Sequence, residues 1–215
     1  MMKIDKDADY YIITADELKI YLAGLGYDRA FGLFNSRLQQ RDELIYTLKN
    51  MTGSDKLLSD GEKFIIPEPI DEAVSIIGSS KKVLVVYSTS GEAVKCYYCG
   101  AENVECRILS GSSSFGISIK KPRELACALV LETEFPEISN DNSEMSNFDI
   151  INSGYVTAFK AKLFCAEGGE TTVEVCFGPV GAPEIVMTDE NGGRQSAAFT
   201  TDALQSLLEC ILREG

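Results

Sequence analysis

Two segments of this chain share one pattern, a strand that leads directly into an amphipathic helix. The first covers residues 115–131 and reads FGISIKKPRELACALVL, and the second covers residues 194–212 and reads RQSAAFTTDALQSLLECIL. In each, alternating small and apolar residues indicate a strand, and apolar residues at helical spacing follow. Leu204 and Leu208 follow Leu125 and Leu129 by 79 residues. This spacing predicts two copies of one β-rich unit, each ended by a helix.

Short strand patterns precede both helices. They cover residues 83–88, 94–99, 104–109 and 116–120 in the first unit, and 156–164, 171–177, 184–188 and 195–199 in the second. The turns between them are too short for anything but antiparallel hairpins. The sequence therefore predicts an α+β fold, mainly an antiparallel sheet built from two repeated β-meander-plus-helix units. The two units are expected to be related by a pseudo-twofold axis, with both helices buried against the sheet. Two unrelated β-meanders that each end in a helix are the alternative.

The residues before these units have a helical pattern. Thr14 and Glu17 form a capping box that predicts a helix over residues 15–23, and a longer helix is expected from residue 35 or 36 to about residue 51. A helical turn at residues 57–58, a tight turn at 59–61, a strand at 64–66 and a helix over 70–77 follow. Four segments result: a helical segment (1–80) packed on the sheet, the first unit (81–132), a polar linker (133–153) and the second unit (154–215). Together they are expected to form one compact domain.

The charge of the chain limits its partners. The formal net charge is −13, so the chain repels nucleic acid and anionic membrane surfaces. The apolar runs, such as residues 83–87, are too short to span a bilayer, so no membrane insertion is expected. The charged start of the chain lacks a signal-peptide pattern, and seven scattered cysteines fit a reducing compartment. A cytoplasmic location is expected.

The residues offer little for catalysis. The chain has no histidine, which excludes Ser-His-Asp and Cys-His arrangements and metal sites with a histidine ligand. Cys96 and Cys99 form a C-x-x-C, but in a strand residues three apart point to opposite faces. The Gly/Ser-rich residues 111–116 and the pairs Asp71-Glu72 and Asp189-Glu190 are better explained as a loop and as solvated surface. We therefore predict no catalytic, cofactor-binding or metal-binding residue, and no enzyme. An enzyme with a cysteine nucleophile is a weaker alternative.

Three stretches give the chain a resemblance to a known family. They are ITADELKIYLAGLG near the start, LLSDGEKFIIPEPIDEAVSIIGSSKKVLVVYS in the middle, and the pair ISIKKPRELACALV and ENGGRQSAAFTTDALQSLLECIL. Their order resembles that of the EspG-like chaperones of type VII (ESX) secretion systems. The resemblance implies a cytosolic, non-enzymatic α+β protein of pseudo-twofold character. It also implies that the chain binds newly made helical secreted proteins of the WXG100, PPE or LXG type.

Two phenylalanines are candidate partner-binding residues. Phe115 follows the Gly/Ser-rich residues and Phe148 lies in the polar linker, and an aromatic ring in an exposed loop suggests docking. The alternative is that both rings fold back onto the core. A second function class stays open as well, that of an immunity-type protein that binds a basic toxin. The oligomeric state is not predicted.

Overall fold

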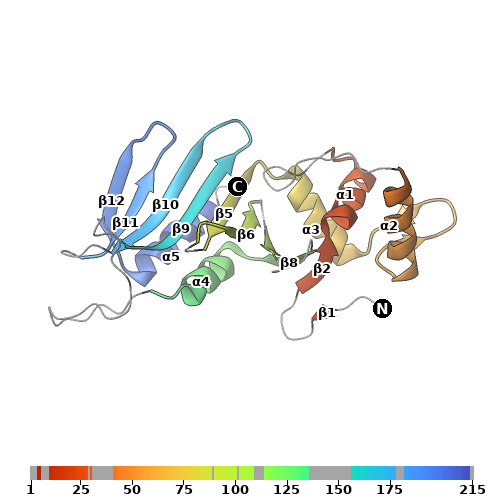
Figure 1. The fold of residues 1–215 in the computed structure, drawn as a ribbon, viewed down its shortest axis with the longest axis horizontal. Coiled ribbons are helices and arrows are strands. Elements are labelled where there is room, and N and C mark those ends of the chain that lie inside the picture. Colours follow the sequence, from red (N-terminus) through yellow and green to blue (C-terminus); the bar gives the residue numbers. More distant parts are fainter. Residues whose placement is uncertain are drawn as a thin grey trace.

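A large antiparallel sheet forms the centre of the computed structural model (Figure 1). The structure describes residues 4–5, 10–28, 30, 41–88, 90–100, 102–108, 114–135, 156–177 and 182–213. The helices within these residues are α1 (Ala15–Gly24), α2 (Arg41–Gly53), α3 (Glu68–Ser79), α4 (Pro122–Glu132) and α5 (Thr201–Arg213). A separate hairpin consists of β3 (Leu58–Ser59) and β4 (Phe64–Ile65).

The sheet has ten strands. In spatial order they are β1 (Ile4–Asp5), β2 (Tyr10–Thr14), β8 (Ser114–Lys120), β7 (Asn103–Ile108), β6 (Ala93–Tyr98), β5 (Lys82–Tyr87), β9 (Val156–Cys165), β10 (Glu170–Phe177), β11 (Glu184–Thr188) and β12 (Arg194–Ala198). Strands β5 to β8 therefore extend as a meander on one side of the β5–β9 pair, and β9 to β12 extend on the other. In that central pair Leu84 lies opposite Leu163. These observations confirm the predicted α+β class and the antiparallel pairing.

The two faces of the sheet carry different helices because successive strand residues point to opposite sides. Leu84 and Val86 of β5 belong to a core with α4 and α5, which also contact each other. Val83 and Val85 belong to a second core with α1, α2 and α3. Figure 1 shows this second group beside the β2–β8 end of the sheet, far from β12. Helices α1 to α3 therefore cover mainly the part of this sheet face that β2 and β5 to β8 form.

The predicted start of α1 is confirmed, whereas α3 begins at Glu68, two residues before the predicted start at residue 70. The Thr14 hydroxyl accepts a hydrogen bond from the Glu17 N–H at 3.1 Å, and the Glu17 carboxylate accepts one from the Thr14 N–H at 2.8 Å. In α5 the Thr200 hydroxyl accepts a hydrogen bond from the Ala203 N–H at 3.0 Å. Each bond satisfies a backbone N–H that has no partner inside its helix.

Two parts of the N-terminal segment differ from the prediction. The helical turn at residues 57–58 is wrong, because Leu58 begins strand β3 and pairs with Ile65 of β4. The Asp60 carboxylate accepts hydrogen bonds from the N–H groups of Glu62 and Lys63, and this turn closes the hairpin. Strand β2 was not predicted at all. The expected start of α2, at residue 35 or 36, lies outside the described residues.

Among the described residues, none of the helices combines the length and the apolar composition that crossing a bilayer requires. The division of the chain into four segments stays a prediction.

Candidate functional site

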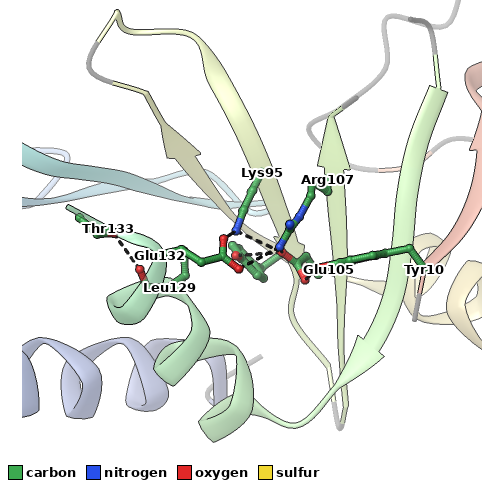
Figure 2. Close-up of polar contacts among 8 residues, drawn as sticks. Tyr10, Lys95, Glu105, Arg107, Leu129, Glu132 and Thr133 are labelled. Atoms are coloured by element: carbon green, nitrogen blue, oxygen red, sulfur yellow. Dashed lines mark hydrogen bonds and ion pairs between the residues drawn. The ribbon is translucent and has the colours of Figure 1, made fainter. Parts of the chain in front are cut away.

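Four charged side chains meet where the end of α4 lies against strands β6 and β7. We call Lys95, Glu105, Arg107 and Glu132 the charge cluster. Figure 2 shows Lys95 and Arg107 pointing toward Glu132, with Glu105 beneath them on the sheet. Lys95 and Arg107 lie directly opposite each other in the β6–β7 pair, so two like charges are neighbours there. The carboxylates of Glu105 and Glu132 lie between them and balance their charge.

Glu105 is the buried member of the cluster, with 2% of its surface exposed. Its carboxylate accepts hydrogen bonds from the Tyr10 hydroxyl at 2.8 Å and from the Tyr97 hydroxyl at 3.4 Å. The Arg107 Nη2 donates to it at 3.2 Å, and the Lys95 Nζ forms an ion pair with it at 3.6 Å. A buried carboxylate without such partners would cost several kcal/mol. Three hydrogen-bond donors and one ion pair, from three strands, therefore hold this charge in the sheet.

Glu132 connects the cluster to α4. Its carboxylate accepts hydrogen bonds from the Lys95 Nζ and, at 3.0 Å, from the Arg107 Nη2. Partial burial opposes the ionisation of Glu132, but the hydrogen bonds and positive charges of Lys95 and Arg107 outweigh it and lower its pKa. The Arg107 guanidinium also lies 4.8 Å from the centre of the Tyr10 ring. The cluster thus joins β2, β6, β7 and the last turn of α4.

The chemistry of this cluster favours a structural role. Its two cations and two carboxylates neutralise each other, and burial raises the pKa of the Tyr10 and Tyr97 hydroxyls, as does the neighbouring Glu105. Both phenols therefore stay protonated and act as donors at neutral pH. No charge in the cluster is left for an anionic or cationic ligand, so it fastens α4 to the sheet.

A second feature is an apolar hollow of about 390 Å³ in the helical segment. It lies between α1, α2 and the β3–β4 hairpin, and it is lined by Ile20, Gly24, Leu25, Leu48, Leu57, Lys63, Phe64, Ile65, Ile66 and Asp71. Eight of these ten residues are apolar or glycine, and the two charged ones have opposite signs. Two of the lining residues, Phe64 and Ile65, are 56% and 40% exposed. The hollow therefore has an apolar wall that is open to solvent.

Most of the exposed large apolar side chains lie on two elements that form walls of this hollow. Within the described part of the chain, seven large apolar side chains are exposed: Leu44, Ile45, Tyr46, Leu58, Phe64, Ile65 and Leu131. All but Leu131 belong to α2 or to the β3–β4 hairpin. Leu44 lies one turn before the lining residue Leu48, on the same side of α2. We call the hollow together with Leu44, Phe64 and Ile65 the apolar surface.

The structure places the predicted site residues as follows. Phe115 lies in strand β8 rather than in a loop, opposite Ile13 and Ile108, and its partly buried ring packs against the core under α1 to α3. Phe148 lies outside the described residues. Phe115 belongs neither to the charge cluster nor to the lining of the hollow. Their role in partner binding stays a prediction.

The motifs that we interpreted as structural have the expected surroundings. Cys96 and Cys99 belong to the cores on opposite faces of the sheet, so their sulfurs do not converge. Asp189 accepts hydrogen bonds from the N–H groups of Asn191 and Gly193 in the β11–β12 turn. Asp71 lines the hollow. Within the ranges that the structure describes, no three histidine, cysteine or acidic residues are close enough together to hold a metal ion.

Sequence reasoning missed both features. Charged residues at 95, 105 and 107 in otherwise apolar strand patterns were the available signal for the charge cluster. The signal for the apolar surface was weaker, because apolar runs such as Leu44-Ile45-Tyr46 and Phe64-Ile65-Ile66 have the composition of core segments. A scan against protein-family models finds no match to this chain. A search of curated proteins finds no significant match either.

Proposed function

We propose that this chain is a non-enzymatic chaperone or adaptor that binds a helical segment of a secreted protein on its apolar surface. The observation that carries the proposal is the open hollow with the exposed Phe64 and Ile65 on its rim. Exposed apolar side chains grouped on one surface are typical of binding sites for other proteins. An amphipathic helix inserts a few apolar side chains into such a hollow, at positions one turn apart.

The resemblance to EspG-like chaperones narrows the partner to a helical protein of the WXG100, PPE or LXG type. A chaperone of this kind covers the apolar face of its substrate until export, so an apolar surface is what the task requires. The net charge of −13 keeps such a protein soluble despite that surface. A cytoplasmic location is part of the proposal, and the seven cysteines without a disulfide support it.

We further infer that the sheet arose from two copies of one β-meander-plus-helix unit. The strand order is the same on both sides of the β5–β9 pair, and each meander is followed by a helix on the same face. Leu84 and Leu163, which are equivalent at the offset of 79 residues, lie opposite each other. A twofold axis at this pair would exchange the two units and bring α4 against α5. EspG-like proteins have the same pseudo-twofold character.

Three of the seven cysteines support the non-enzymatic part of the proposal. Burial raises the pKa of the Cys96 thiol to about 12 and that of the Cys99 thiol to about 11, and it holds the pKa of Cys106 well above its usual value. Only a thiolate is a good nucleophile, so these three are poor candidates for covalent catalysis.

The test is direct binding to purified helical proteins of the WXG100, PPE or LXG type from the same genome. Each of these proteins is purified separately, and its affinity for this chain is measured by isothermal titration calorimetry. We expect Phe64→Asp to weaken binding by about tenfold or more, because a charge would be buried against the partner. Leu131→Asp is the matched control, since Leu131 is 79% exposed but lies on α4, and we expect it to bind like the wild type.

Two results would contradict the proposal. One is that none of these helical proteins binds, while a basic toxin encoded nearby does. The other is a complex that Phe64→Asp leaves unchanged although circular dichroism shows a folded variant.

A further inference from the structure

The sheet ends at strand β12, whose outer edge has no cover among the described residues. This strand pairs only with β11 in the part of the chain that the structure describes, and all five of its residues are exposed. The five β11–β12 pairs follow one another without a bulge. An edge strand of this kind presents a row of unpaired N–H and C=O groups.

The hydrogen bonds at both ends of the β11–β12 pair show which residues present these groups. Asp189 donates its N–H to the Gly193 carbonyl at 3.0 Å, and Phe199 donates to the Pro183 carbonyl at 2.9 Å. Hydrogen-bonded and non-hydrogen-bonded pairs alternate along an antiparallel ladder. Gln195 and Ala197 therefore direct their backbone groups toward β11. Arg194, Ser196 and Ala198 direct theirs away from the sheet.

This edge carries little of the usual protection. Proteins block free edges with lysine, proline, bulges or a covering strand. At the opposite end of the sheet β1 pairs with β2, whereas no strand among the described residues covers β12. Its sequence RQSAA has no proline, and its one charged residue, Arg194, stands at the first position. The small side chains of Ser196, Ala197 and Ala198 leave the rest of the strand accessible.

We propose that β12 binds a short, extended, basic segment of another protein, which adds one strand to the sheet. Backbone groups of Arg194, Ser196 and Ala198 would provide the affinity, and small neighbours would leave room for β-branched or aromatic side chains of the segment. Residues 184–213 contain five acidic and two basic side chains, so the surroundings of this edge favour a positively charged segment.

A second copy of the chain fits the edge less well. Each copy carries a net charge of −13, so two copies repel each other. Figure 1 shows β12 and α2 at opposite ends of the molecule, so this site is separate from the apolar surface. The two proposals therefore stand or fall independently.

The probe is a phage-displayed library of nonapeptides, selected on the full chain. Peptides that are enriched are synthesised, and their affinities are measured by isothermal titration calorimetry. We expect positively charged sequences with alternating β-branched residues. Bound peptide should slow hydrogen exchange of the Arg194, Ser196 and Ala198 amides, which have no partner on β11.

Two matched variants test the backbone contact. Ser196→Pro removes an N–H that points away from β11, while Ser196→Ala keeps it. We expect Ser196→Pro to weaken peptide binding by about tenfold, because one backbone hydrogen bond to the peptide is lost. Ser196→Ala should change the affinity by less than about twofold. Peptides that are N-methylated at the amides facing β12 should bind equally weakly, and they leave the protein unchanged.

Three results would overturn the proposal. The first is a library that yields no enriched peptide, and the second is N-methylated peptides that bind as well as the unmodified ones. The third is a dimer in analytical ultracentrifugation that Ser196→Pro converts to a monomer, because the edge would then bind a second copy.

Discussion

Removing the Tyr10 hydroxyl is expected to destabilise the fold chiefly when Glu105 carries its charge. The hydroxyl donates to the Glu105 carboxylate at 2.8 Å, and both residues are buried. Tyr10→Phe keeps the ring, so its contact with the Arg107 guanidinium at 4.8 Å stays. A hydrogen bond to a buried charge stabilises a fold by about 1.5–3 kcal/mol. We therefore expect Tyr10→Phe to lower the free energy of unfolding by about 2 kcal/mol.

The assay is a double-mutant cycle measured by urea unfolding at pH 7. It compares the wild type, Tyr10→Phe, Glu105→Gln and the double variant. In the Glu105→Gln background the acceptor is a neutral amide, so Tyr10→Phe should cost about 1 kcal/mol or less. Tyr46→Phe is the control, because Tyr46 is 68% exposed on α2, and its effect should stay within about 0.5 kcal/mol.

The reasoning is refuted if the two substitutions are additive within about 0.5 kcal/mol. Additivity would mean that the Tyr10 hydroxyl does not stabilise the Glu105 charge. A loss in Tyr46→Phe as large as that in Tyr10→Phe would refute it as well, because the effect would then not depend on burial.

Two further substitutions test the cores. The pKa of Cys99 is raised from 9.0 to about 11 by burial, so between these pH values the unfolded chain loses a proton that the folded chain keeps. The free energy of unfolding should therefore fall as pH rises, and Cys99→Ala should reduce this slope by about 1.4 kcal/mol per pH unit, measured by urea unfolding under reducing conditions. An unchanged slope would contradict the burial of this thiol. In Gly78→Ala the added Cβ would lie 2.4 Å from a Tyr27 ring carbon, so we expect a loss of about 1–3 kcal/mol in thermal unfolding. In Gly53→Ala the added Cβ meets no heavy atom within 4 Å, so we expect a stability equal to or above that of the wild type. A larger loss of stability in Gly53→Ala than in Gly78→Ala would contradict this packing.

Local patterns explain how much of the fold could be predicted from the sequence. The strands of both meanders were predicted because short apolar runs between Gly, Ser and Asn turns allow little else. Thr14 and Glu17 predicted the start of α1 because a capping box depends only on neighbouring residues. Strand β2 was missed for the opposite reason. Its apolar run YYII has no alternation, and its pairing with β8 joins residues about a hundred positions apart, such as Tyr11 and Ile117.

The charge cluster could not be predicted for a similar reason. Lys95, Glu105, Arg107 and Glu132 come from three elements, and their meeting depends on the strand register that places Lys95 opposite Arg107. No spacing in the sequence encodes this register. The apolar surface was missed because an apolar run such as Phe64-Ile65-Ile66 has the same composition whether a core or a partner covers it. Only the packed structure shows that Phe64 stays exposed.

The central β5–β9 pair has a consequence for the synthesis of the chain. Strand β5 has the apolar sequence KVLVVY, with side chains in the cores on both faces of the sheet. Its neighbour β6 leaves the ribosome soon after it, but β9 follows only after a whole meander and α4 have been made. Until then the β5 edge and the side chains that α5 will cover are open to other chains. We therefore expect the nascent first half to need a chaperone that keeps other chains away from β5. A ribosome-bound fragment that ends at residue 135 should bind ribosome-associated chaperones more strongly than the full chain does.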